Sequence, residues 1–142
     1  MKRFVAILLL VVLCLSMTGC SSYSKNELLN AMDVKEADFN YVTMAEGEKN
    51  VIVLGWEKEG VTQIITKMEF MSMFGGATED VSAEWMAVRE EAVQMSKDLQ
   101  AKLDAKYDGK ATVEVAVCTS KNEVALRVRA GEITYNFVEG KA

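Results

Sequence analysis

The feature that most constrains the fold is a long amphipathic stretch between Val81 and Tyr107. Its apolar residues recur in steps of four and three, which places them on one face of an α-helix: Val81, Trp85, Val88, Ala92, Met95, Leu99 and Leu103. Acidic residues favour the start of a helix, so we expect it to begin near Asp80 or Ser82. Asp108-Gly109 predicts its end, because glycine tolerates the left-handed conformation in which helices stop.

Strand-like segments before this helix decide between two interpretations of its apolar stripe, a coiled-coil seam or a face that packs on a sheet. Three segments read as strands: Phe39 to Ala45, Asn50 to Trp56, and Val61 to about Met73. Short polar turns with a glycine separate them, which is typical of an antiparallel meander. In the third segment Ile64, Met68, Phe70 and Phe74 share one face of the expected strand and should face the core. Packing on a sheet is therefore favoured.

Three more strands are predicted after the helix, at Ala111 to Thr119, Glu123 to Ala130 and Ile133 to Phe137. Alternation places Cys118 beside Glu114 and Ala116, opposite a face of valines, where a lone thiol is most often a small packing residue. The sequence thus predicts one α+β domain over residues 39–142. It consists of an antiparallel sheet of about five to six strands, in the order meander, long helix, meander, with the long helix packed on one face.

The N-terminus carries an export signal over residues 1–19. Lys2 and Arg3 precede an apolar run from Phe4 to Leu15, and small residues then lead to Cys20. This arrangement resembles the lipobox of bacterial lipoproteins, although Met17 stands where leucine is usual. The resemblance implies cleavage after Gly19 and a diacylglyceryl thioether on Cys20, hence a membrane anchor made of lipid. The alternative is an ordinary secretory signal followed by an accidental cysteine.

Residues 20–38 are expected to form the lipidated N-terminus, a tether and a short helix. Ser24-Lys25-Asn26-Glu27 matches a capping box, and Leu28, Leu29 and Met32 follow at helical spacing. Such a helix either packs on the domain or holds it away from the bilayer. Of the three cysteines, Cys14 leaves with the signal and Cys20 is modified, so the mature chain cannot form an internal disulfide.

Charge and residue inventory narrow the possible functions. Without Lys2 and Arg3 the chain keeps 14 lysines and arginines against 21 acidic residues, a side-chain net charge of −7. An acidic chain with no basic run repels phosphate backbones, so we expect no nucleic-acid partner. The sequence contains no histidine, which excludes Ser-His-Asp, Cys-His and HExxH chemistry within this chain. Catalysis by carboxylates or lysine is the enzymatic option that this inventory leaves.

No catalytic residue and no cofactor is predicted, but four groups of residues are candidates for a site. Thioethers suit Cu(I), so Met68, Met71 and Met73 form a candidate metal site, against which core packing is favoured because a strand would split them over two faces. Acidic pairs, which could bind calcium or act in acid-base catalysis, are better explained as solvated surface: Glu57 with Glu59, and Glu79 with Asp80. Gly75-Gly76 lacks the rest of a phosphate-binding motif. Exposed aromatic residues could line a pocket: Tyr23, Tyr41 or Trp56.

The order of elements gives a second resemblance. A lipobox, a hairpin, a helix that ends in Lys106-Tyr107-Asp108-Gly109 and a hairpin with a charged turn follow one another. This layout, from about Asn50 to Arg129, is similar to the small YehR-like lipoproteins, a family whose biochemical function is unassigned. The resemblance implies a compact α+β envelope lipoprotein and brings no catalytic residues with it.

Together these features predict an exported bacterial lipoprotein, anchored to the cell membrane through a lipid on Cys20, which acts as a non-enzymatic binding or envelope-interaction module. Its expected partners are the membrane, through the lipid, and an envelope protein or a small ligand. The alternative is an enzyme that uses carboxylates, or a copper-binding protein that uses methionines.

Overall fold

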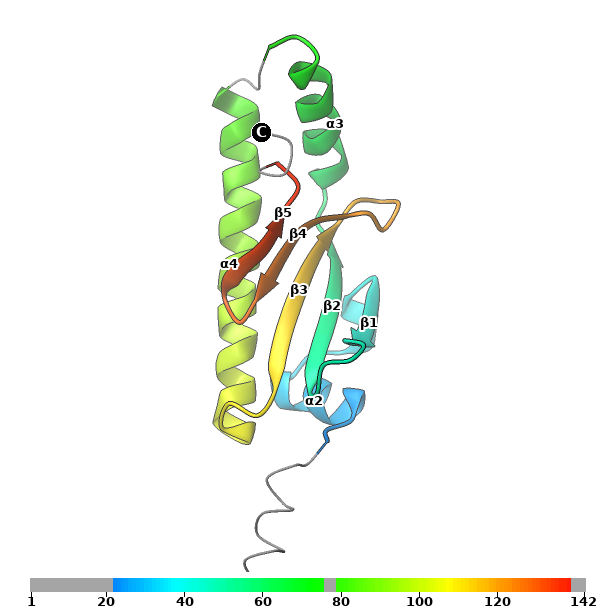
Figure 1. Ribbon diagram of the computed structural model, residues 1–142, viewed down its shortest axis with the longest axis vertical. Helices are drawn as coiled ribbons and strands as arrows, with labels where there is room; N and C mark the ends of the chain where they lie inside the picture. Colours follow the sequence, from blue (N-terminus) through cyan, green and yellow to red (C-terminus); the bar gives the residue numbers. More distant parts are fainter. Residues whose placement is uncertain (1–21, 76–78, 139–142) are drawn as a thin grey trace, which may run out of the picture.

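The computed structural model describes residues 22–75 and 79–138, and these form a five-stranded mixed sheet with helices against one face (Figure 1). The fold is therefore α+β, as predicted. The elements, in chain order, are α2 (Lys25–Met32), the 3-10 helix η1 (Glu36–Asp38), β1 (Tyr41–Met44), β2 (Val51–Glu57), α3 (Val61–Ser72), α4 (Glu79–Tyr107), β3 (Thr112–Cys118), β4 (Val124–Arg129) and β5 (Glu132–Asn136).

The strands lie in the sheet in the same order as in the chain, β1-β2-β3-β4-β5. Three of the four neighbouring pairs are antiparallel, but β2 and β3 run parallel, with Val51 opposite Thr112 and Glu57 opposite Cys118. Parallel neighbours cannot be joined by a tight turn, because the chain must return to the starting edge of the sheet. Here α3 and α4 make that return, so the sheet is mixed where an all-antiparallel one was expected.

The predicted strand from Val61 to Met73 is wrong, because this segment forms helix α3. Val61, Ile64 and Ile65 are all buried, which is the spacing of one helical face. A short apolar run fits both the helical period and the strand period. The β-branched residues of this segment favour a strand, which explains the wrong prediction. Gly60 lies in the left-handed conformation at the N-cap (φ 88°), so the preceding turn leads into a helix.

The long helix is confirmed as α4, and its apolar stripe packs on the sheet. Six of the seven predicted positions are buried and Met95 is partly buried. Near the C-terminal end of α4, Leu99 and Leu103 pack with Ile52 and Val113. Near its N-terminal end, its side chains share a second cluster with α3, β3 and β4. The stripe is thus a core face and not a seam for another helix.

Helix α2 belongs to the packed domain. Its capping box is present: the Glu27 N–H donates to Oγ of Ser24 at 3.2 Å, and the Ser24 N–H donates to Oε2 of Glu27 at 2.8 Å. Leu28, Leu29 and Met32 are buried in the same cluster as Leu103. Of the two roles considered for this segment, packing on the domain is the observed one.

The two ends of α4 lie in different surroundings (Figure 1). At the C-terminal end, the ring of Tyr107 lies 4.0 Å from that of Tyr23, centroid to centroid, so the start of the described chain is held there. At the other end, α3 and the first turns of α4 extend beyond the strands. Among the described residues, no helix is long and apolar enough to cross a membrane.

Replacing Leu99 with aspartate should unfold the domain. Leu99 is 6% exposed, and the change removes an apolar side chain and places a carboxylate in the same space. We expect a loss of about 4 kcal/mol or more, close to the whole stability of a small domain. Ala101→Asp, on the exposed face of the same helix, should cost less than about 1 kcal/mol. Thermal unfolding followed by circular dichroism compares the two, and equal midpoints would contradict the buried stripe.

Candidate functional site

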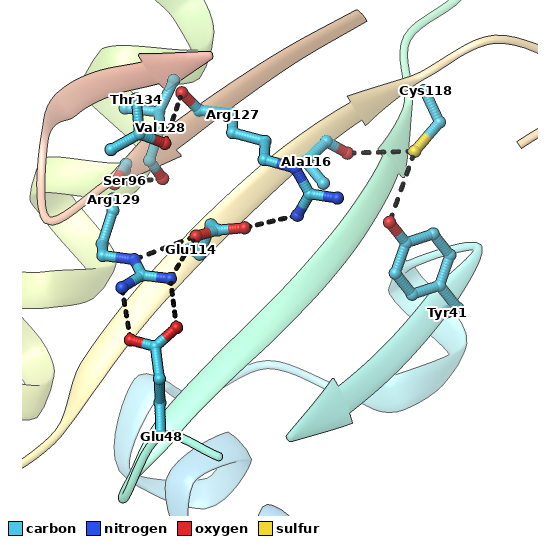
Figure 2. A network of polar contacts seen from close by, with 10 residues as sticks. All are labelled: Tyr41, Glu48, Ser96, Glu114, Ala116, Cys118, Arg127, Val128, Arg129 and Thr134. Atoms are coloured by element: carbon cyan, nitrogen blue, oxygen red, sulfur yellow. Dashed lines mark hydrogen bonds and ion pairs between the residues drawn. The ribbon is translucent and has the colours of Figure 1, made fainter. Parts of the chain in front are cut away.

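The sheet face away from the helices carries the main polar cluster of the described residues. Strand alternation and register place Glu114, Ala116 and Cys118 of β3 on this face, with Arg127 and Arg129 of β4 beside them. We call it the open face, since its own buried cluster contains no helical residue. Figure 2 shows the polar side chains that converge here from β1, β3, β4 and the loop between β1 and β2.

Glu114 is the centre of this cluster. Its side chain is only 4% exposed, and both carboxylate oxygens are used: Nη1 of Arg127 donates to Oε1 at 2.6 Å, and Nε of Arg129 donates to Oε2 at 2.9 Å. Arg129 also binds Glu48 through Nη1 at 2.6 Å and Nη2 at 3.1 Å (Figure 2). A buried carboxylate is tolerated only when it is paired and hydrogen-bonded, and the two guanidinium groups meet that need.

The charges of the cluster compensate one another. Two carboxylates pair with two guanidinium groups, so the net charge of the cluster is zero. Arg129 holds the pKa of Glu48 below its ordinary value, and its own pKa is raised by the hydrogen bonds to Glu48 and Glu114. The cluster ties the β1–β2 loop across β2 and β3 to β4. Its arrangement is that of a structural clamp, in which each carboxylate is paired with a guanidinium group.

Tyr41 and Cys118 lie next to this clamp. The ring of Tyr41 covers Gly55, where a Cβ atom would come within 2.2 Å of the ring carbon Cε1, so only glycine fits there. Sγ of Cys118 lies 3.8 Å from the Tyr41 hydroxyl oxygen and donates to the carbonyl of Ala116 at 3.3 Å. Burial, followed by the contact with Cys118, raises the pKa of Tyr41 to about 12.

The Cys118 thiol is not an activated nucleophile. It is fully buried, and burial raises its pKa, although Tyr41 and Arg127 act in the opposite direction. A reactive cysteine needs an accessible thiolate, and this site gives neither access nor a lowered pKa. The prediction that Cys118 packs on the face of Glu114 and Ala116 is confirmed. Strand pairing also brings Arg127 near the thiol, which alternation within β3 alone does not predict.

The methionine candidates are distributed differently from the expectation, because their segment is a helix. Met68 and Met71, three residues apart, share the helical side that packs against the core, and both are partly buried. Met73 is the C-cap residue and is 77% exposed. The structure therefore does not bring the three thioethers together. Among the described residues, no three cysteine or acidic side chains form a group that could hold a metal ion.

The other predicted candidates do not converge either. Glu57 and Glu59 are exposed, and Glu57 accepts a hydrogen bond from Asn40 at 2.9 Å. The side chains of Glu79 and Asp80 lie outside the described part of the structure, as do Gly76 and the predicted lipidation site Cys20. The aromatic candidates occupy three separate places: Tyr23 against Tyr107, Tyr41 on the open face, and Trp56 between the two core clusters.

Two hollows are present on the described surface. One, of about 160 Å³, lies between α3 and the β3–β4 turn and has Thr66, Glu69 and Lys121 in its wall. The other, of about 400 Å³, is a shallow groove between α4 and β5 lined by Met86, Val93 and Ile133, with charged side chains around them. Neither of these two hollows contains the Glu114 clamp or Cys118.

Phe70 and Phe74 are exposed apolar residues at the end of α3, and the prediction that they face the core is wrong. They were expected to face the core of a strand with Ile64 and Met68, but their side chains are 62% and 75% exposed. Their rings lie 5.1 Å apart, centroid to centroid, at the end of α3. Reading this segment with the helical period would have put them opposite the buried residues.

Comparisons with known proteins find no match for this chain: no protein-family model matches it, and no curated protein and no solved structure is significantly similar to it. The resemblances to lipoproteins, including the YehR-like family, therefore stay predictions from the sequence.

Replacing Glu114 with alanine should destabilise the domain by about 2 to 3 kcal/mol, because two arginines lose their shared partner while a buried space opens beneath them. Glu114→Gln keeps the shape and one acceptor and should lose less. Glu48→Ala removes only the exposed partner of Arg129 and should have a much smaller effect. Urea denaturation measures all three, and an E114A protein as stable as wild type would show that the clamp is dispensable.

Tyr41 should make the protein lose stability in alkali. The unfolded tyrosine ionises near pH 10.0, whereas the pKa in the folded protein is about 12. The neutral form is thus favoured in the folded state, so this contribution is complete below pH 10 and is lost as the pH rises toward 12. The free energy of unfolding should fall more steeply for wild type than for Tyr41→Phe across that range. Parallel curves would contradict a raised pKa.

Proposed function

We propose that this protein is a bacterial envelope lipoprotein that is held at the membrane by a lipid on Cys20 and presents an α+β domain as a non-enzymatic binding module. Support for the anchor comes from the sequence: the charged n-region, the apolar run and the small residues before Cys20 fall in register. The resemblance to YehR-like lipoproteins agrees with this proposal.

The observation that carries the proposal is the position of the two ends of the domain. Tyr23, three residues after Cys20, packs on Tyr107 at the C-terminal end of α4. The α3–α4 projection lies at the other end of the same helix (Figure 1). The exposed rings of Phe70 and Phe74 lie at the end of α3. A domain that is anchored at one end and has exposed apolar side chains at the opposite end has the arrangement of a module that presents a binding surface away from its anchor.

The polar chemistry of the described residues favours binding over catalysis. The acidic side chain that is most deeply buried, Glu114, is fully engaged by Arg127 and Arg129. The thiol of Cys118 is buried with a raised pKa. An enzyme of the carboxylate type needs acids that converge in a hollow with room for substrate. The hollow that has Glu69 and Glu123 in its wall measures only about 160 Å³, and Lys121 lines it as well.

Replacing Cys20 with alanine should release the protein from the membrane. The change removes the sulfur that the lipid would occupy, and two acyl chains supply stable anchoring at about 0.8 kcal/mol per buried methylene. Cell fractionation with metabolic palmitate labelling should find wild type in the membrane fraction and labelled, and Cys20→Ala unlabelled and mainly outside it. Ser22→Ala is the matched control and should behave as wild type. A C20A protein retained and labelled as before would contradict the anchor.

A further inference from the structure

The described chain is held by the fold almost from its first residue. The N–H of Tyr23 donates to Oδ1 of Asn50 at 2.8 Å, and the Tyr23 ring lies 4.0 Å from that of Tyr107, centroid to centroid. We call these three residues the tether contact. Figure 1 shows the start of the described chain at the end of the molecule where α4 also ends. The chain therefore enters the domain at one end of its long axis.

Asn50 is the residue that fixes Tyr23 to the domain. It is 8% exposed, and its Nδ2 donates to the carbonyl oxygen of Lys110 at 3.2 Å. Its backbone lies in the left-handed region, at φ 57°, which asparagine adopts more readily than most residues. One side-chain amide thus joins the start of the chain to the turn between α4 and β3. If Tyr23 moved away, a nearly buried oxygen would lose this hydrogen bond.

Helix α2 continues the attachment. Leu28 and Met32 are fully buried in a cluster that α4 shares. At the start of α2, the Tyr107 hydroxyl donates to the carbonyl oxygen of Glu27 at 3.3 Å. At its end, Nζ of Lys102 donates to the carbonyl oxygen of Met32 at 3.2 Å. Helix α2 is therefore part of the packed domain and does not lengthen the tether.

The tether contact decides how far the domain reaches from a lipid on Cys20. If the whole segment before β1 were an open tether, the 21 steps from Cys20 to Tyr41 would span up to about 76 Å, at about 3.6 Å each. The three steps from Cys20 to Tyr23 span at most about 11 Å. This limit follows from covalent geometry and holds for any conformation of those residues. The end of the domain that contains Tyr23 is thus held next to the bilayer.

Charge disfavours the alternative in which the domain lies on its side. After Gly19 the side chains sum to a net charge of −7, and anionic headgroups repel a negatively charged surface. An end-on arrangement brings only one end of the molecule to the headgroups and keeps most of its surface in water. The short covalent link and the net charge therefore favour the same orientation.

We infer that the end of the domain at the tether contact faces the lipid headgroups of the membrane that holds the anchor, and that α4 points away from this membrane. This inference rests on the proposed function, in which Cys20 carries the lipid. Asn50 is the positioning residue, because it holds Tyr23 on the domain. With 29 residues in α4, the far end of this helix lies at most about 54 Å from the bilayer surface. A partner of the domain must contact it within that distance of the membrane.

Energy transfer to the bilayer tests this orientation. The purified lipidated protein is labelled with a donor dye at Ala105→Cys, on the last turn of α4, or at Ser72→Cys, at the end of α3. Both positions are exposed, whereas the native Cys118 is buried and should take no label. Each protein is reconstituted into vesicles of phosphatidylethanolamine and phosphatidylglycerol that carry an acceptor dye on the lipid headgroups.

We expect several-fold more transfer from position 105 than from position 72. Lys67 of α3 pairs with Glu84, which precedes Ala105 by 21 residues, or about 32 Å along α4. An insertion of about 20 glycine and serine residues between Ser21 and Ser22 adds an r.m.s. span of about 25 Å, so it should lower transfer from position 105 and reduce the difference. Equal transfer from both positions, more transfer from position 72, or no effect of the insertion would overturn the inference.

Hydrogen exchange tests the role of Asn50 separately. In the lipidated protein in detergent micelles, the Tyr23 amide should exchange about fivefold or more slowly than in an unstructured peptide. Asn50→Gly removes both amide atoms but keeps the left-handed backbone, so it should raise this rate toward that of the peptide. Asn122→Gly is the matched control, because Asn122 is also left-handed (φ 60°) and lies in the turn at the other end of β3. A Tyr23 amide without protection in the wild type, or one that Asn50→Gly leaves unchanged, would contradict the role of Asn50.

The measurements separate the anchor from the orientation. Mass spectrometry of the purified protein shows whether Cys20 carries the lipid, and a chain without lipid would overturn both the proposed function and this inference. A lipidated chain whose two labels transfer equally would overturn the orientation alone and leave the anchor intact.

Discussion

The structure depends above all on the contact between the apolar stripe of α4 and the inner face of the sheet. One helix of 29 residues supplies apolar side chains to both buried clusters, from Val81 at one end to Leu103 at the other. Because β2 and β3 are parallel, the chain between them must cross the sheet, and α4 forms most of that crossing while it covers the valines of β3. The strand order and the hydrophobic core therefore both depend on the apolar face of α4. Without burial of this stripe, the sheet would lose both its cover and the connection that sets its strand order.

The open face of the sheet is stabilised differently, without a helix to cover it. Glu114 is buried under the side chains of Arg127 and Arg129, and Tyr41 lies flat over Gly55. Long amphipathic side chains can cover a strand with their stems while the charged ends stay at the solvent. The paired arginines thus cover Glu114 and shield this side of the sheet from water. Their neutrality and complete pairing explain why this cluster stabilises the architecture and offers little for catalysis.

The exposed Phe70, Met73 and Phe74 at the end of α3 differ from both of these regions, because they belong to neither of the two core clusters under the helices. Val61, Ile64 and Ile65 hold α3 against α4, and the phenylalanines on the far side of the helix are left in solvent. Exposed rings at the end of a helical projection carry a risk of aggregation unless they have a partner. We therefore place the proposed binding role at this end and not at the clamp or in the hollows.

The sequence by itself determined much of the fold. The steps of four and three between Val81 and Leu103 specify a helix with one buried face, the Ser24-Glu27 capping box specifies the start of α2, and alternation specifies the strands on either side. These are local signals, because each follows from the period of a helix or a strand and needs no distant partner. The same alternation placed Glu114 and Cys118 on one face of β3 and Arg127 and Arg129 on one face of β4.

Only the tertiary structure decided the rest. The segment after Val61 is apolar with β-branched residues, and its pattern fits both the helical and the strand period. Its secondary structure therefore depends on its packing, and against α4 it forms a helix. That choice turned Phe70 and Phe74 outward and separated Met73 from Met68 and Met71. Strand pairing likewise brought the two arginines to Glu114, and Glu48 joined them from a loop 81 positions away from Arg129. Contacts between distant residues leave no periodic signal in the chain, because they arise from the path of the whole backbone and not from the spacing of neighbours.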